Sequence, residues 1–189
     1  MFALLTSIQS LLDGGGHIVL AIDGRCGSGK STLAALLAER FGGRVVHMDD
    51  FFLPFELRDE QTLEKIGGNI HRQRLVSEVM YHLRDTELCY NRYRCREGIF
   101  APVRLPDSRL TVVEGSYSLL PELRQYYDLT VFCDVSQKVQ RRRITEREKD
   151  RAEMFFERWI PLEERYFSQF EVAGHADIIL NMENTLCSD

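Results

Sequence analysis

Short apolar runs alternate along the chain with longer stretches whose apolar residues recur every three or four positions. The apolar runs cover residues 17–22, 44–48, 109–114, 128–135 and 176–180. Helical spacing is found in residues 30–41, 74–84 and 137–170. The last of these stretches contains Pro161, where we expect the helix to be interrupted. Buried strands separated by helices are typical of βαβ units, so the sequence predicts an α/β fold: a parallel five-stranded sheet with helices on both faces.

Two further segments complete the pattern. At the N-terminus, helical spacing is shown by Leu4, Leu5, Ile8, Leu11 and Leu12, which predicts a short helix that packs on the core. Residues 89–98 alternate tyrosine with arginine and predict a β-hairpin, which either lies beside a substrate or is simply exposed. We find no internal repeat and expect one domain over residues 1–189.

Composition and charge exclude several classes of function. A net charge of −5 disfavours non-specific nucleic-acid binding, and no run approaches the roughly 18 apolar residues of a membrane span. The five cysteines are Cys26, Cys89, Cys95, Cys133 and Cys187. They form no C-x-x-C pair, and the histidines show no ligand spacing, so we expect no structural zinc site. Unpaired cysteines suit a reducing compartment, which predicts a cytoplasmic protein.

A glycine-rich turn joins the first strand to the following helix. Gly24, Gly29, Lys30 and Ser31 satisfy the pattern G-x-x-x-x-G-K-[ST]. The glycines allow successive backbone N–H groups to face inward, and the helix that begins near Lys30 adds its positive dipole end. We expect Lys30 to reach the β- and γ-phosphates of ATP and the Ser31 hydroxyl to bind Mg²⁺. The predicted nucleotide-binding residues are Gly24, Cys26, Gly27, Ser28, Gly29, Lys30, Ser31 and Thr32.

The other motifs of nucleotide-binding proteins distinguish among the classes. The chain has no guanine-reading N-K-x-D and no L-S-G-G-Q-like string, which disfavours GTPases and ABC ATPases. Kinases of small molecules need a carboxylate after the next strand, where it can accept a proton from the substrate hydroxyl. Asp49 and Asp50 follow the strand 44–48 directly. A small-molecule kinase is therefore the favoured class.

Four motifs in order resemble those of one known family. They are "GRCGSGKST", "MDDFF", "VVEGSYSLL" and "YYDLTVFCDV", and an arginine-rich segment follows them. From about Ile18 to about Phe170 the chain resembles the uridine kinase and phosphoribulokinase family, which also includes nicotinamide riboside kinases. The resemblance implies a P-loop NTPase fold with a helical, arginine-rich lid at about residues 137–158. It also implies transfer of the γ-phosphate of ATP to a hydroxyl with Mg²⁺ as cofactor.

The same resemblance implies roles for the acidic residues. Asp49 matches the general base of these kinases, and Glu114, at the end of its strand, matches the acidic residue associated with Mg²⁺. Neighbouring residues at a strand end point to opposite sides, so we expect Asp50 to do a different job from Asp49. Asp50 could cap a helix, contact Mg²⁺ through water or have no chemical role.

Three arginines of the expected lid share one helix face. Arg143, Arg147 and Arg151 are spaced four residues apart, and like charges at this spacing repel. A bound anion would relieve the repulsion, whereas the alternative is an ordinary solvated, charged helix. The resemblance implies that the lid closes over ATP, so Arg143 and Arg147 are predicted to stabilise charge in the transition state.

The acceptor pocket is less clearly marked. Uridine kinases hold the ribose with an Asn-x-Asp-like pattern, where this chain has Asn69 and His71. A neutral imidazole makes one hydrogen bond per ring nitrogen, whereas a carboxylate can accept two ribose hydroxyls. The predicted substrate-binding residues are Asp49, Phe52, Asn69, His71 and Tyr93.

We expect the acceptor to be a neutral nucleoside, with uridine or cytidine first and nicotinamide riboside next. One alternative is a nucleoside monophosphate kinase, whose anionic acceptor would bind arginines such as Arg72, Arg74, Arg92 and Arg94. The other is a nucleotide-binding regulator without transfer activity. The expected partner is a small molecule, with neither nucleic acid nor membrane, and the sequence indicates no oligomeric state.

Overall fold

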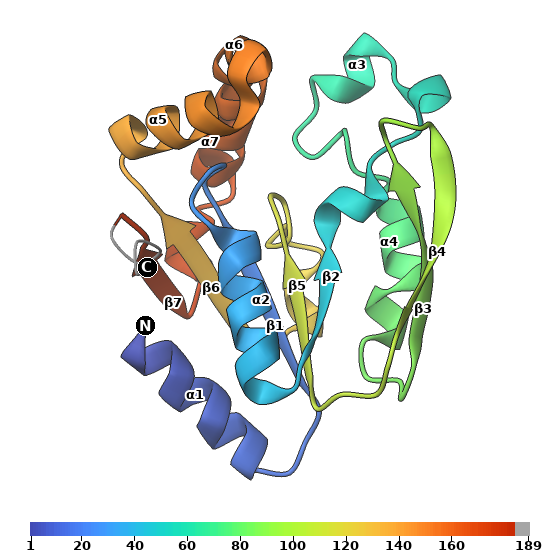
Figure 1. The fold of residues 1–189 in the computed structure, drawn as a ribbon, viewed down its shortest axis with the longest axis vertical. Helices are drawn as coiled ribbons and strands as arrows, with labels where there is room; N and C mark the ends of the chain where they lie inside the picture. Colours follow the sequence, from blue (N-terminus) through green and yellow to red (C-terminus); the bar gives the residue numbers. More distant parts are fainter. Residues whose placement is uncertain (184–189) are drawn as a thin grey trace.

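A five-stranded parallel sheet forms the centre of the molecule, with strand order β2-β5-β1-β6-β7 (Figure 1). The structure, a computed structural model, describes residues 1–183. The strands are β1 (Ile18–Gly24), β2 (Arg44–His47), β5 (Leu110–Glu114), β6 (Leu129–Asp134) and β7 (Ile178–Asn181). All residues of β1 and β5 are buried, as expected of central strands covered on both sides. The predicted five-stranded parallel sheet is confirmed.

Helices cover both faces of this sheet. On one face lie α1 (Phe2–Asp13) and α2 (Lys30–Phe41), whose apolar side chains pack with Leu20 and Ile22 of β1. On the other face, Val19 and Ala21 of the same strand belong to a core that includes Leu75 and Tyr166. These two residues come from α4 (Arg72–Glu78) and α7 (Ile160–Gln169). The alternation of side chains along β1 therefore supplies both cores.

The predicted hairpin is present beside the main sheet. Strands β3 (Leu88–Arg94) and β4 (Ile99–Leu105) pair antiparallel, and they run alongside α4 in Figure 1. Tyr90 and Tyr93 are buried, whereas most of β4 is exposed. The hairpin thus packs one side on the protein and connects the segment after α4 to β5.

Two helical segments differ from the prediction. The helix expected over 74–84 is α4, which ends at Glu78, followed by a 3₁₀ turn at Met80–His82. Between them, Val79 has φ −126° and ψ −56°, which breaks the α-helical hydrogen-bond series. The short helix α3 (Glu60–Leu63), which begins with the side-chain cap of Asp59, was not anticipated.

The charged stretch after β6 is interrupted at two places. It contains α5 (Gln137–Glu148), a 3₁₀ turn (Lys149–Arg151), α6 (Ala152–Met154), a π-helical turn (Phe155–Trp159) and α7. The break at Lys149, whose φ is +50°, was not predicted. The interruption predicted near Pro161 is the π-helical turn, which ends directly before α7. Pro161 is tolerated because it lies in the first turn of α7, where backbone N–H groups lack α-helical partners in any case.

None of the helices described within residues 1–183 is long and apolar enough to cross a membrane. The free thiols of this part of the chain are Cys26, Cys89, Cys95 and Cys133, and Cys187 lies outside the described residues.

Candidate active site

The turn between β1 and α2 forms a glycine cradle at the carboxyl edge of the sheet. Gly24, Gly27 and Gly29 have φ of +134°, +73° and +96°, in the region that favours glycine. A Cβ atom on Gly24 would lie 2.0 Å from the carbonyl oxygen of Cys133 on the adjacent strand β6. No other residue fits there without moving the backbone. The turn therefore has the shape expected of a phosphate-binding loop (P-loop, residues 24–31).

Lys30 is buried at the base of this loop. Its Nζ donates hydrogen bonds to the carbonyl oxygens of Gly24 at 2.6 Å and Arg25 at 3.0 Å. Burial alone lowers the pKa of Lys30, but the surrounding Glu163, Cys26, Asp23 and Glu114 outweigh burial, and the pKa is raised. Lys30 therefore carries a positive charge under the loop, where a phosphate would need it.

Ser31 and Glu114, the predicted Mg²⁺ pair, lie side by side. The Ser31 hydroxyl donates to Glu114 Oε2 at 3.1 Å, although the residues are far apart in sequence. The other carboxylate oxygen, Oε1, lies 2.5 Å from Nδ1 of His47. That hydrogen bond raises the pKa of His47. His47 was missed by sequence reasoning, because its pairing with Glu114 depends on the register between β2 and β5.

Asp49 and Asp50 lie on a 3₁₀ turn (Met48–Phe51) that follows β2, and their surroundings differ. Asp50 accepts a hydrogen bond of 2.7 Å from the Tyr90 hydroxyl. Within residues 1–183, the Asp49 carboxylate has no hydrogen-bond partner. Asp49 reaches solvent, yet the protein packed around it and the nearby Glu114 raise its pKa, with Lys30 and His47 acting in the opposite direction. An unengaged carboxylate with a raised pKa can accept a proton.

A cavity of about 380 Å³ opens beside Asp49. We call it the acceptor pocket, and its lining residues are Asp49, Asp50, Phe52, Arg92, Tyr93, Arg94, Cys95, Arg96 and Glu97. Of the predicted substrate-binding residues, Asp49, Phe52 and Tyr93 lie on it. Asn69 and His71 do not line this pocket but pair with the segment that follows Asp50. The Asn69 carbonyl accepts a hydrogen bond from the Leu53 N–H at 2.8 Å, and the His71 N–H donates to the Phe51 carbonyl at 2.7 Å.

A buried carboxylate from α7 binds the P-loop backbone. Both oxygens of Glu163 accept from the Cys26 N–H, at 3.0 and 2.9 Å. The Ser116 hydroxyl at 2.9 Å and the Gln140 side-chain amide at 3.4 Å complete its partners. Burial raises the pKa of Glu163, and Lys30 opposes the rise. The next residue, Glu164, is ion-paired with Arg25 of the loop. Nothing in the sequence distinguished Glu163 from the other charged residues of its helix.

Two of the three spaced arginines reach the P-loop. Arg143 donates to the carbonyl oxygens of Gly27 at 3.2 Å and Ser28 at 3.4 Å. Its other nitrogen donates to the carbonyls of Met182 and Glu183. Arg147 donates to Cys26 Sγ at 3.5 Å and pairs with Glu148. Phosphate binding by Arg143 and Arg147 stays a prediction. Arg143 also joins the P-loop to the residues that directly follow β7.

The predicted nucleotide site also includes Ser28, Thr32 and Cys26. Ser28 is buried, and within the described chain its hydroxyl has no partner. Thr32 is exposed in the first turn of α2. Burial raises the pKa of the Cys26 thiol, so we expect this cysteine to stay protonated rather than to act as a nucleophile.

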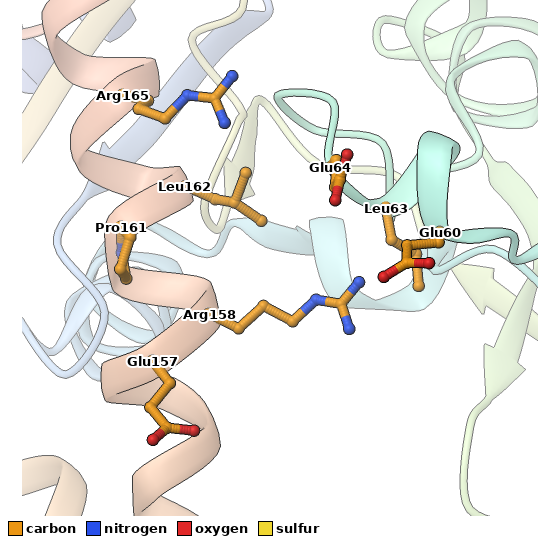
Figure 2. A pocket seen from close by; sticks show the side chains of 8 residues that line it. All are labelled: Glu60, Leu63, Glu64, Glu157, Arg158, Pro161, Leu162 and Arg165. Atoms are coloured by element: carbon orange, nitrogen blue, oxygen red, sulfur yellow. The ribbon is translucent and has the colours of Figure 1, made fainter.

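A second cavity, of about 250 Å³, separates α3 from the segment 155–169 (Figure 2). One wall carries Glu60 of α3 and Glu64, the residue directly after this helix. From the opposite wall, Arg158 and Arg165 extend toward them. Within the described chain no ion pair joins the two walls. An open cleft with charges of both signs therefore lies between α3 and the segment 155–169.

Comparisons with known proteins bear on the fold. No protein-family model matches the chain, and no curated protein sequence matches it. Among solved structures, it is similar to a possible uridine kinase from Bacillus stearothermophilus, with a TM-score of 0.69 and 23% identity over 88% of this chain and 90% of that chain. A protein from Silicibacter sp. TM1040, provisionally described as a fructose transport system kinase, gives a TM-score of 0.60 and 23% identity over the same shares.

The chain shares the fold of these two structures. The predicted P-loop NTPase architecture is thereby confirmed, and the neighbours agree with the resemblance to uridine kinase-like proteins. At this identity the likeness concerns the fold, so the chemistry has to be argued from the residues of this chain.

Proposed function

We propose that this protein is an ATP-dependent kinase that transfers the γ-phosphate to a hydroxyl group of a small metabolite. The observation that supports this best is the convergence of Lys30, Ser31, Glu114 and Asp49 at the carboxyl edge of the sheet. A buried cation, a hydroxyl–carboxylate pair and an unengaged carboxylate are the parts that phosphoryl transfer needs. A regulator without transfer activity would not need the unengaged carboxylate.

Ser31 and Glu114 fit a Mg²⁺ ion. Mg²⁺ prefers oxygen ligands and is commonly held by one or two protein oxygens together with substrate phosphates and water. The Ser31 hydroxyl and Glu114 Oε2, 3.1 Å apart, provide such a pair at the end of the P-loop. When bound, Mg²⁺ neutralises charge on the β- and γ-phosphates.

The other groups either bind the phosphates of ATP or accept the proton of the acceptor hydroxyl. Backbone N–H groups of the loop and Lys30 would bind phosphate oxygens, and Arg147 would add a second cationic group from α5. Asp49 orients the acceptor hydroxyl and accepts its proton as the new O–P bond forms. The acceptor lies in the pocket of about 380 Å³ that Asp49 lines.

A coupled assay of ADP formation tests this function directly. The panel contains uridine, cytidine, nicotinamide riboside, pantothenate and nucleoside monophosphates as acceptors. A nucleoside is our first candidate for the acceptor. Activity confined to monophosphates would replace the hydroxyl by an anionic acceptor group. ATP binding without ADP formation across the whole panel would favour the regulator.

His71 gives a prediction about nucleoside use. In the His71→Asp variant, a carboxylate takes the place of an imidazole that can make one hydrogen bond per ring nitrogen. We expect kcat/KM for uridine to rise by about tenfold, the factor that one charge-assisted hydrogen bond supplies. The assay compares uridine with 2′-deoxyuridine, and the gain should be confined to uridine. A gain of equal size for both would show that the residue acts on something other than the ribose.

Glu163 gives a second prediction. The Glu163→Gln variant keeps one acceptor oxygen but presents an amide N–H₂ in place of the other, so the two-oxygen contact with Cys26 is lost. We expect the KM for ATP to rise by about tenfold through a less ordered P-loop, with the acceptor KM little changed. The matched control is Glu153→Gln, which changes an exposed carboxylate of the same charged segment. Equal KM values for ATP in both variants would remove Glu163 from the nucleotide site.

A further inference from the structure

Three arginines of the hairpin line the acceptor pocket. Arg92, Arg94 and Arg96 occur at every second position of the chain, so those on the strand project from the same side of β3. Asp49 and Asp50 line the same pocket from the end of β2, and the rings of Phe52 and Tyr93 belong to the lining as well. The pocket thus combines the carboxylates of one element with the guanidinium groups of another.

These arginines differ from the others around them in having no partner. Within residues 1–183, no hydrogen bond or ion pair joins the guanidinium groups of Arg92, Arg94 and Arg96 to the protein. In contrast, Arg104 on the paired strand is ion-paired with Glu87, and Arg74 is paired with Glu78. The neighbouring arginines are therefore paired, whereas those at the pocket have no direct partner, although Asp49, Asp50 and Glu97 line the same pocket.

Arg92 is the least easily explained as a solvated surface residue. Its Nε is buried and has no hydrogen-bond partner in the described chain, although a buried donor is costly when it is left unpaired. Arg92 also lies close to Tyr90, whose hydroxyl donates a hydrogen bond to Asp50. The positive charge of Arg92 lowers the pKa of Tyr90, although burial has the larger effect and raises it. An oxyanion in the pocket would pair with these guanidinium groups and reduce the repulsion among the three arginines.

We propose that the acceptor carries an oxyanion, a carboxylate or a phosphate, that binds Arg92 and Arg94 while its hydroxyl faces Asp49. This inference rests on the proposed kinase function and changes the expected acceptor from a neutral nucleoside to one with an anionic group remote from the reacting hydroxyl. Guanidinium groups bind carboxylates and phosphates through paired N–H donors, so both groups share the recognition chemistry.

The test uses acceptor pairs that differ in one anionic group. Orotidine is compared with uridine, and ribose 5-phosphate with ribose. We expect at least one charged member to exceed its neutral partner by roughly 10- to 100-fold in kcat/KM, the factor of one charge-assisted hydrogen bond. The first pair reports a carboxylate, and the second reports a phosphate.

Arg92→Gln and Arg94→Gln should remove this preference mainly through the KM of the charged acceptor. Arg104→Gln, on the same hairpin but outside the pocket, should retain it. Calorimetric titration of the charged acceptor, with the P-loop filled by a non-hydrolysable ATP analogue, gives a readout independent of turnover. Binding should weaken in the first two variants alone.

The outcomes separate this inference from the proposed function. Equal or better use of the neutral members by the wild-type protein would overturn the oxyanion site and leave the kinase standing. A preference that survives in Arg92→Gln and Arg94→Gln would also overturn it. Calorimetric binding of charged acceptors that is lost in these variants, without any ADP formation, would support the oxyanion site and count against the kinase. Failure of every charged acceptor to bind the wild-type protein would overturn the inference.

Discussion

Replacing Asp49 with asparagine is expected to slow phosphoryl transfer by roughly 10²–10⁴-fold, the usual contribution of general-base catalysis. The asparagine keeps the size of the side chain but cannot accept a proton. The Asp49 carboxylate has no hydrogen-bond partner within residues 1–183, so the substitution should leave the fold and the P-loop unchanged. Steady-state kinetics should therefore show a loss in kcat with ATP binding close to that of the wild-type protein.

The pH dependence provides a second readout of the same variant. Because its surroundings raise the pKa of Asp49, the protonated and inactive form persists to higher pH than for an ordinary aspartate. Activity should fall on the acid side as pH drops through this raised pKa. The acid limb should disappear from the residual activity of Asp49→Asn. An unchanged limb would assign the titration to another group.

Glu114→Gln is the natural comparison, since it alters the neighbouring carboxylate rather than the base. Removing the charge opposite Ser31 should raise the Mg²⁺ concentration needed for half-maximal activity. The acid limb should persist but move to lower pH, because Glu114 helps to raise the pKa of Asp49. If Asp49→Asn were nearly as active as the wild-type protein, the base would lie elsewhere. Asp50, on the same turn and engaged by Tyr90, would be the first residue to examine.

The second large effect is expected from Lys30→Ala, which should weaken Mg-ATP turnover by about 10²–10³-fold or more, as removal of one preorganised charge donor does. Lys30 is the buried cation beneath the P-loop, and no other lysine or arginine donates to the carbonyls of Gly24 and Arg25 within the described chain. Calorimetry with a non-hydrolysable ATP analogue measures the loss of binding separately from the loss of turnover.

Stability has to be measured in the same experiment. Without Lys30, the buried carboxylates of Asp23 and Glu163 lose a compensating charge, and their raised pKa values should rise further. A carboxyl whose pKa is raised on folding favours the folded state at pH below its unfolded pKa, and this contribution is lost as pH rises through the folded value. The variant should therefore melt closer to the wild-type protein at acidic pH than at neutral pH.

Lys30→Arg separates charge from geometry. It keeps the positive charge that Asp23 and Glu163 require, but a planar guanidinium cannot occupy the place of the compact ammonium group. We expect a melting temperature near that of the wild-type protein together with much reduced ATP turnover. Full turnover and unchanged ATP affinity in folded Lys30→Ala would contradict the assignment of the P-loop as a phosphate site.

The sequence by itself determined the parts whose causes are local. The glycines, Lys30 and Ser31 specify a turn and a helix start within a few residues, and the apolar runs are long enough to specify buried strands. Asp49 and Glu114 could be placed together from the sequence because the carboxyl ends of parallel strands meet at one edge of the sheet.

The break in the charged helices shows where local reasoning is weakest. Pro161 is a local signal, and the π-helical turn ends directly before the helix that contains it. The other break, at Lys149, has no such signal, because no glycine or proline stands there to indicate a positive φ. Propensity is a weak guide at such a position, since tertiary contacts compete with it.

Only the tertiary structure decided which charged residues bind the P-loop. Glu163 reaches the Cys26 N–H across 137 positions of the chain, and Arg143 reaches Gly27 across 116. Arg143 lies in a helix where nearly every residue is polar, and Glu163 is followed by Glu164 and Arg165, so nothing local distinguishes either from its charged neighbours. The pairing of His47 with Glu114 depends likewise on the register of β2 against β5, which forms only when the sheet assembles.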